Sequence, residues 1–269
     1  MTGQHGRGDE IIELGGGIFG LLSRPQGAPR TPCVVLLNAG FLPRWGPFRL
    51  HVRLARRLAA HGYPVFRFDL PGVGDTLALA DRPLTLILRE VLDALRSLVG
   101  YERFIVGGIC AAADIAWQTA LADPRVVGVI LLDGLARPTW SYKLSRVQRA
   151  LRAPVSTWPG KVRRLLARPD DDSTAPANAL LRDWPAPGAE RTQLQTLVER
   201  GVELFFLYTG GTSYFLHARQ FIETFGPAAR SGHVQFHHWP QCDHVFYDVA
   251  DRDELIATVT RWLERPSTS

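Results

Sequence analysis

The sequence predicts an α/β protein with a mostly parallel, twisted sheet and helices on both of its faces. Two observations support this fold class. Unbroken apolar runs, which are typical of strands buried on both faces, alternate with segments whose apolar residues recur at helical spacing. The alternation runs from Cys33 to Asp133, stops at Ala136 and resumes at Arg191. We therefore expect parallel strands joined by helices in a core that carries one insertion.

The first half of the chain begins with a predicted hairpin, in which residues 11–23 form two short apolar stretches around the turn Gly15–Gly17. A helix is expected over residues 48–61, because its apolar residues recur every three or four positions and Gly62 follows as a C-cap. The other elements expected here are the strands Cys33–Asn38, Pro64–Asp69, Arg103–Gly108 and Val126–Asp133, and the helices Pro83–Val99 and Ala111–Ala122.

The alternation is interrupted at residues 136–190, which are rich in proline and contain short amphipathic pieces. We interpret this segment as an inserted subdomain, so that the core comprises residues 1–135 and 191–269. The elements expected after the insertion are a helix that ends at Arg200, the strand Val202–Tyr208, the helix Ser213–Phe225, the strand His233–Trp239 and the helix Asp251–Glu264.

The composition excludes several classes of protein. With 46% hydrophobic and 21% charged residues among 269, the chain is not expected to be disordered. No apolar run reaches the roughly 18 residues of a membrane-spanning helix, and the N-terminus lacks the apolar core of a secretory signal. Three widely spaced cysteines exclude a disulfide framework and a Cys-x-x-Cys metal site. These features predict a cytoplasmic protein without a transmembrane segment.

The net charge of +5 is concentrated in the insertion, where nine basic residues and no acidic residue lie between Ala136 and Arg168. Such a segment fits an anionic partner, which could be a phosphopantetheine group, coenzyme A, an acidic acyl-carrier protein or a membrane face. It is equally typical of a solvated basic surface with no partner. Because no aromatic stacking platform or DNA-binding motif accompanies the charge, nucleic acid is not expected.

One strand-to-helix junction carries the strongest chemical signal. It reads Gly108-Ile-Cys110-Ala-Ala112, which places a nucleophile between small residues on a tight turn. Larger side chains two positions away on either side would clash, and the dipole of the following helix favours a thiolate. We interpret Cys110 as the nucleophile, the alternative being an inert buried thiol. Cys33 and Cys242 lack this context and are expected to be structural.

Motifs over almost the whole chain resemble the α/β-hydrolase superfamily. The segments Leu37-Asn-Ala-Gly-Phe and Arg67-Phe-Asp-Leu-Pro-Gly-Val-Gly-Asp are similar to those of bacterial hydrolases with a Cys at the nucleophile elbow, some of which accompany exosortase systems. Many of that group read Gly-Leu-Cys-Ser-Gly-Ala-Asp at the elbow, where this chain has Ala111 and Ala112 in place of Ser and Gly. The resemblance implies an α/β-hydrolase fold in which residues 136–190 form a cap over the nucleophile.

The resemblance also implies the other members of the site. The superfamily's base is a His after the last strand, and Pro240-Gln-Cys-Asp-His244 places His244 there. The acid usually follows the strand that ends here at Tyr208, but Thr209–Tyr214 contains no carboxylate. Asp133, after the preceding strand, is a second position that some members use, and it keeps the order nucleophile, acid, base. The alternatives are a structural role for Asp133 and a Cys–His dyad, which a thiol tolerates.

An acyl-transfer site also needs N–H donors for the developing oxyanion. The resemblance assigns them to Ala111, directly after the nucleophile, and to Phe41, which follows the Gly40 of the first strand's loop. Trp140 and Tyr142, at the start of the insertion, would line an apolar substrate pocket or else form the core of the cap.

Together these residues predict a Cys-dependent hydrolase or acyltransferase, thioesterase-like or esterase-like, that acts on an ester or thioester through an acyl-enzyme on Cys110. The acyl donor is expected to be a small molecule, free or carried by an acyl-carrier protein or coenzyme A. Neither a cofactor nor a metal is expected. Two alternatives stay open: a non-hydrolytic cyclase or condensing enzyme on the same site, and a catalytically silent binding module.

Overall fold

The computed structural model describes residues 9–38, 40–77, 82–151, 182 and 184–265. Its centre is an eight-stranded sheet with the strand order β1-β2-β4-β3-β5-β6-β7-β8. β2 pairs antiparallel with β1 and with β4, whereas every other neighbouring pair in the sheet is parallel. The strands are β1 (Glu10–Gly15), β2 (Ile18–Ser23), β3 (Cys33–Leu37), β4 (Val65–Phe68), β5 (Phe104–Ile109), β6 (Val126–Leu132), β7 (Glu203–Thr209) and β8 (Val234–Trp239).

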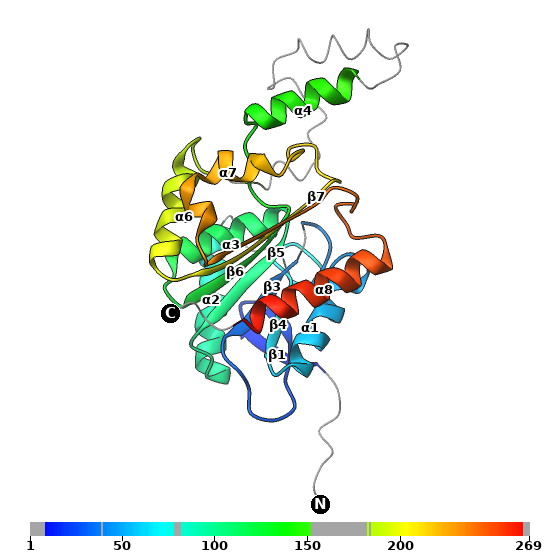
Figure 1. Ribbon diagram of the computed structural model, residues 1–269. Coiled ribbons are helices and arrows are strands. Elements are labelled where there is room, and N and C mark those ends of the chain that lie inside the picture. The colour runs from blue at the N-terminus through cyan, green and yellow to red at the C-terminus, as the bar shows by residue number, and fades with distance from the viewer. Residues whose placement is uncertain (1–8, 39, 78–81, 152–181, 183, 266–269) are drawn as a thin grey trace, which may run out of the picture.

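Helices cover both faces of this sheet (Figure 1). One face carries α2, α3, α6 and α7, and the other carries α1 and α8. This arrangement confirms the predicted fold class. The helices are α1 (Leu50–Ala60), α2 (Leu84–Val99), α3 (Ala111–Ala122), α4 (Trp140–Leu151), α6 (Ala189–Glu199), α7 (Arg219–Phe225) and α8 (Val249–Leu263), with short 3-10 turns at Pro47–Arg49 and Pro227–Arg230.

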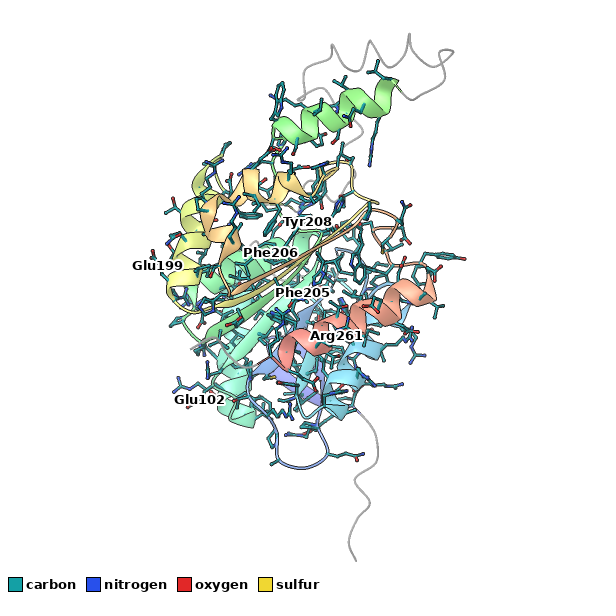
Figure 2. The ribbon with its side chains drawn as sticks, viewed as in Figure 1. Glu102, Glu199, Phe205, Phe206, Tyr208 and Arg261 are labelled. Atoms are coloured by element: carbon teal, nitrogen blue, oxygen red, sulfur yellow. The ribbon has the colours of Figure 1, made fainter. Side chains whose placement is uncertain are left out.

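The sheet separates two hydrophobic cores, because successive residues of a strand point to opposite faces. On β7, Phe206 and Tyr208 belong to the core beneath α6 and α7, whereas Phe205 points to the core beneath α1 and α8 (Figure 2). Phe205 also lies against Trp262 of α8, with 5.6 Å between the ring centroids. A strand buried on both faces is expected to be apolar throughout, which is why β3 and residues Leu204–Tyr208 of β7 are unbroken apolar runs in the sequence.

Most expected elements lie within two residues of their predicted bounds, but the helix predicted over Ser213–Phe225 is wrong in its first half. α7 begins only at Arg219. Two aromatic side chains hold the preceding residues out of the helix. The Phe215 ring stacks on Tyr208 with 4.0 Å between centroids, and the Tyr214 hydroxyl donates a hydrogen bond to the backbone carbonyl of Asp133. Tertiary contacts therefore override the local helical pattern.

The predicted insertion is described only in part. α4 contacts α7 and lies beyond it at the top of Figure 1. Residues 152–181 and 183, which carry much of the predicted cap and of its positive charge, lie outside the described residues. Among the helices that the structure describes, none is long and apolar enough to cross a membrane.

The parallel strands bring distant parts of the chain to one edge of the sheet. Cys110 directly follows β5, Asp133 directly follows β6, Thr209 ends β7, and His244 lies in the loop after β8. Because the carboxyl ends of parallel strands share an edge, these four residues are neighbours in space although they span more than half of the chain.

Candidate active site

Cys110 occupies a strained turn between β5 and α3. Its backbone has φ 61° and ψ −120°, a conformation that residues other than Gly rarely adopt, and its N–H donates to the Leu132 carbonyl at 2.8 Å. A Cβ added at Gly108 would lie 2.5 Å from the Cβ of Ala112. The two positions that flank the nucleophile therefore touch each other, and the small residues expected there are sterically required.

The three cysteines, all of which the structure describes, differ in their surroundings. Cys33 and Cys242 are buried, and burial raises the pKa of both thiols. Cys110 is partly exposed and lies at the N-terminal end of α3. Since the thiolate is the nucleophile, Cys110 is the thiol placed to react.

A cavity of about 220 Å³ opens beside the Cys110 thiol. Most of its wall is apolar, and Cys110 and His244 are the polar side chains that face it. Its size and lining suit a short apolar group attached to a reactive carbonyl. The residues that line it are Gly40, Phe41, Leu42, Pro47, Ile109, Cys110, Ala111, His244 and Val245.

His244 lies between Cys110 and Asp133. Its Nδ1 is 2.7 Å from Oδ2 of Asp133, and its ring also hydrogen-bonds the Cys110 thiol. Burial alone would lower the pKa of His244, but the hydrogen bonds and charges of Asp133 and Cys110 outweigh it and raise the pKa to about 9. At neutral pH the ring is therefore an imidazolium that donates to the Asp133 carboxylate.

The Asp133 carboxylate is fully buried and fully hydrogen-bonded. Thr209 donates to it twice, from its backbone N–H to Oδ1 and from its hydroxyl to Oδ2, both at 2.7 Å. His244 supplies the third donor. Three donors fix the position of this buried carboxylate, so Asp133 can in turn fix the orientation of the His244 ring.

Two positions of the loop after β7 have no room for a side chain. A Cβ added at Gly210 would lie 1.9 Å from the carbonyl oxygen of Pro240, and one at Gly211 would lie 2.2 Å from the backbone nitrogen of His244. The loop that carries His244 therefore packs directly on the backbone of these glycines. Asp133 reaches the same histidine from the neighbouring strand, so His244 has a carboxylate partner although Thr209–Tyr214 contains none.

Asn38 shapes the loop that is predicted to stabilise the oxyanion. It is buried, its Nδ2 donates to the Gly40 carbonyl at 2.5 Å, and its Oδ1 accepts from the Leu70 N–H at 2.8 Å. Because the C=O and N–H of a trans peptide point in opposite directions, the Phe41 N–H points away from Asn38. The other predicted donor, Ala111, is the first residue of α3, whose N–H has no partner within the helix.

Two sequence-predicted residues are not brought to this cavity. Trp140 and Tyr142 lie on α4, where Trp140 is 75% exposed and the Tyr142 ring faces the Arg146 guanidinium at 5.8 Å. Neither belongs to the described cavity wall. Asp243, the neighbour of His244 in sequence, accepts hydrogen bonds from the backbone of its own loop at 2.8 and 2.9 Å.

Sequence reasoning missed four residues around the site. Thr209 and Asn38 position the acid and the oxyanion loop, and Arg182 and Tyr214 contact the backbone of Asp133. No local pattern marks Thr209, Arg182 or Tyr214. Asn38 follows a buried strand directly, and a buried amide at a strand end is a signal that could have been used.

Unfolding stability is expected to depend on pH through His244. Its pKa rises from 6.5 to about 9 on folding, so the stabilisation is complete below about pH 6.5 and is lost as the pH rises through about 9. Because 32% of the side chain is exposed, screening reduces the effect to about 2 kcal/mol.

Urea unfolding of the wild type and a His244→Gln variant, at about pH 6 and about pH 10, measures this contribution. The wild type should be the more stable protein at the lower pH, and the difference should shrink at the higher pH. If the difference in unfolding free energy between the two proteins is the same at both pH values, His244 is not the source of the pH dependence.

Among the residues that the structure describes, no group of three or more His, Cys, Asp or Glu side chains could hold a metal ion. The geometry instead offers a thiol, an imidazolium, a buried carboxylate and two backbone N–H groups around one apolar cavity. This set is suited to attack on a carbonyl carbon followed by proton transfer to the leaving group.

Comparison with known proteins gives a consistent result. The family model described as alpha/beta hydrolase fold matches residues 32–176, more than half of the chain. A search of curated proteins finds no match. One similar solved structure is an esterase from Pyrococcus furiosus, with a TM-score of 0.62 and 15% sequence identity; the match covers 96% of this chain and 89% of that one. A thermophilic esterase from Thermogutta terrifontis has a TM-score of 0.58 and 18% identity, with 97% of this chain and 99% of that one covered. A proline iminopeptidase from Mycobacterium smegmatis has a TM-score of 0.58 and 15% identity, with 95% of this chain and 97% of that one covered.

Proposed function

The chain belongs to the alpha/beta hydrolase fold family, and we propose that it is a Cys-dependent acyl hydrolase or acyltransferase, which acts on an ester or thioester through an acyl-enzyme on Cys110. One observation carries the proposal: an unbroken series of contacts runs from the Cys110 thiol through His244 to the buried carboxylate of Asp133. This series supplies a nucleophile, a proton carrier and a fixed counter-charge in one place.

In the first half of the reaction, the Cys110 thiolate attacks the acyl carbon and the carbonyl oxygen becomes an oxyanion. The N–H groups of Phe41 and Ala111 hold that oxyanion. When the tetrahedral intermediate collapses, the bond to the leaving alcohol or thiol breaks and His244 gives that group its proton. The products are a neutral imidazole, a free alcohol or thiol, and a thioester on Cys110.

In the second half, the neutral His244 takes a proton from water or from an acceptor alcohol or amine, whose heavy atom attacks the thioester. The same two N–H groups hold the second oxyanion. Collapse expels the Cys110 thiolate, and the imidazolium is restored beside it. Asp133 keeps its charge throughout and stabilises the imidazolium in the resting state and in both transition states.

The cavity points to an apolar acyl group as the part of the substrate next to Cys110. A donor carried by coenzyme A or an acyl-carrier protein is supported by the exposed cations of α4, namely Lys143, Arg146 and Arg149. The esterases and the peptidase with a similar fold act on acyl bonds according to their names, which supports the same reaction class here. The loop after β7 contains no carboxylate, which favours a catalytically silent binding module. The contact between His244 and Asp133 supports a catalytic site instead, because it supplies the acid from the neighbouring strand.

Intact-protein mass spectrometry after mixing with p-nitrophenyl butyrate tests the proposal. The wild type, or a His244→Ala variant whose second half-reaction is slowed, should gain the mass of one butyryl group. Cys110→Ala should gain none, whereas Cys33→Ala, a matched change at a buried cysteine, should behave as the wild type. An adduct that is absent from both of the first two proteins, or that persists in Cys110→Ala, would contradict the acyl-enzyme.

A further inference from the structure

A buried arginine from the predicted insertion lies beside the site and has no part in the reaction described above. The Arg182 side chain is 10% exposed and pairs with Asp114, which lies in the first turn of α3. Its Nε is 2.7 Å from Oδ2 of Asp114, and its NH2 group is 3.2 Å from Oδ1. This two-point contact fixes the guanidinium relative to the helix that begins at the nucleophile.

Two aromatic rings hold the same guanidinium from its sides. Its central carbon is 4.7 Å from the centre of the Trp184 ring and 4.8 Å from that of Tyr214. The Trp184 Nε1–H also donates to Asp114 at 2.9 Å. Asp114, Trp184 and Tyr214 together therefore fix the orientation of the Arg182 guanidinium. A surface arginine with no role beyond solubility would not need contacts of this kind.

The cluster also reaches the candidate catalytic acid. The backbone carbonyl of Asp133 accepts a hydrogen bond from Arg182 NH2 at 3.3 Å and another from the Tyr214 hydroxyl at 2.5 Å. Asp133 has φ 50°, a left-handed conformation that is unfavourable for Asp unless its surroundings hold it there. The two donors supply that restraint at the backbone carbonyl of Asp133.

Arg182 keeps its positive charge in this place. Burial would lower its pKa, but the hydrogen bond and charge of Asp114 and the charges of Tyr214 and Cys110 raise it. Arg182 therefore presents a charged guanidinium to the Asp114 carboxylate and to the backbone carbonyl of Asp133.

We propose that Arg182 is a positioning residue, which fixes the elbow of Cys110 and the loop of Asp133 relative to each other. Asp114 connects Arg182 to α3, and the Tyr214 hydroxyl donates to the same Asp133 carbonyl as Arg182 does. The inference rests on the proposed function, because it assigns Arg182 a role in aligning that same site. It also makes catalysis depend on the insertion, from which Arg182 comes.

Steady-state hydrolysis of p-nitrophenyl butyrate, with kcat and KM measured separately, tests this role. Arg182→Met should lower kcat about 10²-fold with little change in KM, because misalignment acts on the transition state. Arg182→Lys should recover only part of kcat, since Lys keeps the positive charge but cannot make the two-point contact with Asp114.

The matched control is Arg125→Met, which removes a comparable two-point pair with the buried Asp123 at the opposite end of β6. It should lower stability without changing kcat. If Arg182→Met does not fold, the double variant Asp114→Asn with Arg182→Met removes the unpaired buried carboxylate and should show the same loss of kcat with little change in KM.

The outcomes distinguish this inference from the proposed function. If the wild type hydrolyses the ester and Cys110→Ala does not, but the Arg182 variants match Arg125→Met in kcat, the positioning role is wrong and the acyl-enzyme stands. If wild-type Cys110 is not acylated by the ester, the proposed function fails, and the positioning role fails with it.

Discussion

Replacing Cys110 by Ser is expected to lower the rate of ester hydrolysis at least about 10³-fold, although the two side chains differ by one atom. The reason is the protonation state of His244, whose pKa is raised to about 9 because, against the effect of burial, Asp133 and Cys110 favour the imidazolium. The change to Ser removes the contribution of Cys110 but leaves the hydrogen bond and charge of Asp133, which still favour the imidazolium. A hydroxyl nucleophile needs a neutral imidazole to take its proton, and the imidazolium at neutral pH cannot do so. A thiol releases its proton near pH 8.5 even without help, so it can pair with the imidazolium as a thiolate.

Initial rates with p-nitrophenyl butyrate at about pH 7.5 measure this effect, with Cys33→Ala as the control for a cysteine change remote from the cavity. The Ser variant should stay folded, because Cys110 is partly exposed and the hydroxyl is the smaller group. A Ser variant with a tenth or more of the wild-type rate would show that His244 works as a conventional base and would contradict the ion-pair mechanism.

Asp133→Asn is expected to lower kcat about 10²- to 10⁴-fold. The carboxylate accepts three hydrogen bonds, two from Thr209 and one from His244. An amide has one acceptor oxygen, so its NH2 group must face either a Thr209 donor or the His244 N–H. Either arrangement removes the charge that stabilises the imidazolium, and the second also forces the histidine into the wrong tautomer.

The matched control is Asp243→Asn, which changes the carboxylate next to His244 in sequence. Because Asp243 bonds the backbone of Val245 and Tyr247, this variant should keep kcat within about threefold of the wild type. Single-turnover hydrolysis of p-nitrophenyl butyrate compares the two directly. Equal losses in both variants, or no loss in Asp133→Asn, would remove Asp133 from the mechanism.

Much of the fold follows from the sequence because its signals are local. A central buried strand such as β3 is apolar at every position, and α3 begins and ends at the predicted residues because the elbow and the helix are contiguous in sequence. The prediction for residues 213–218 was wrong because a long-range cause decides it. Tyr214 and Phe215 are held by contacts with Asp133 and Tyr208 that no window of sequence reveals.

The same distinction between local and long-range causes applies to the residues of the site. Cys110, Asp133 and His244 were predicted, and the structure brings them together, because each immediately follows or closely follows a parallel strand and strand ends share an edge. Arg182 could not be predicted, because its neighbours in sequence do not determine that it reaches Asp114 across 68 residues. For Trp140, exposure on α4 depends on where the helix lies in space, which its amphipathic pattern does not specify.

The two glycines after β7 limit how this site can change through evolution. In Gly210 and Gly211, any side chain would collide with the backbone of the loop that carries His244. An acid therefore cannot be introduced at either glycine by a single substitution unless the His244 loop moves at the same time. Such a movement would shift the general base away from Asp133 and Cys110, so at these two positions a gain of side chain and a loss of alignment come together.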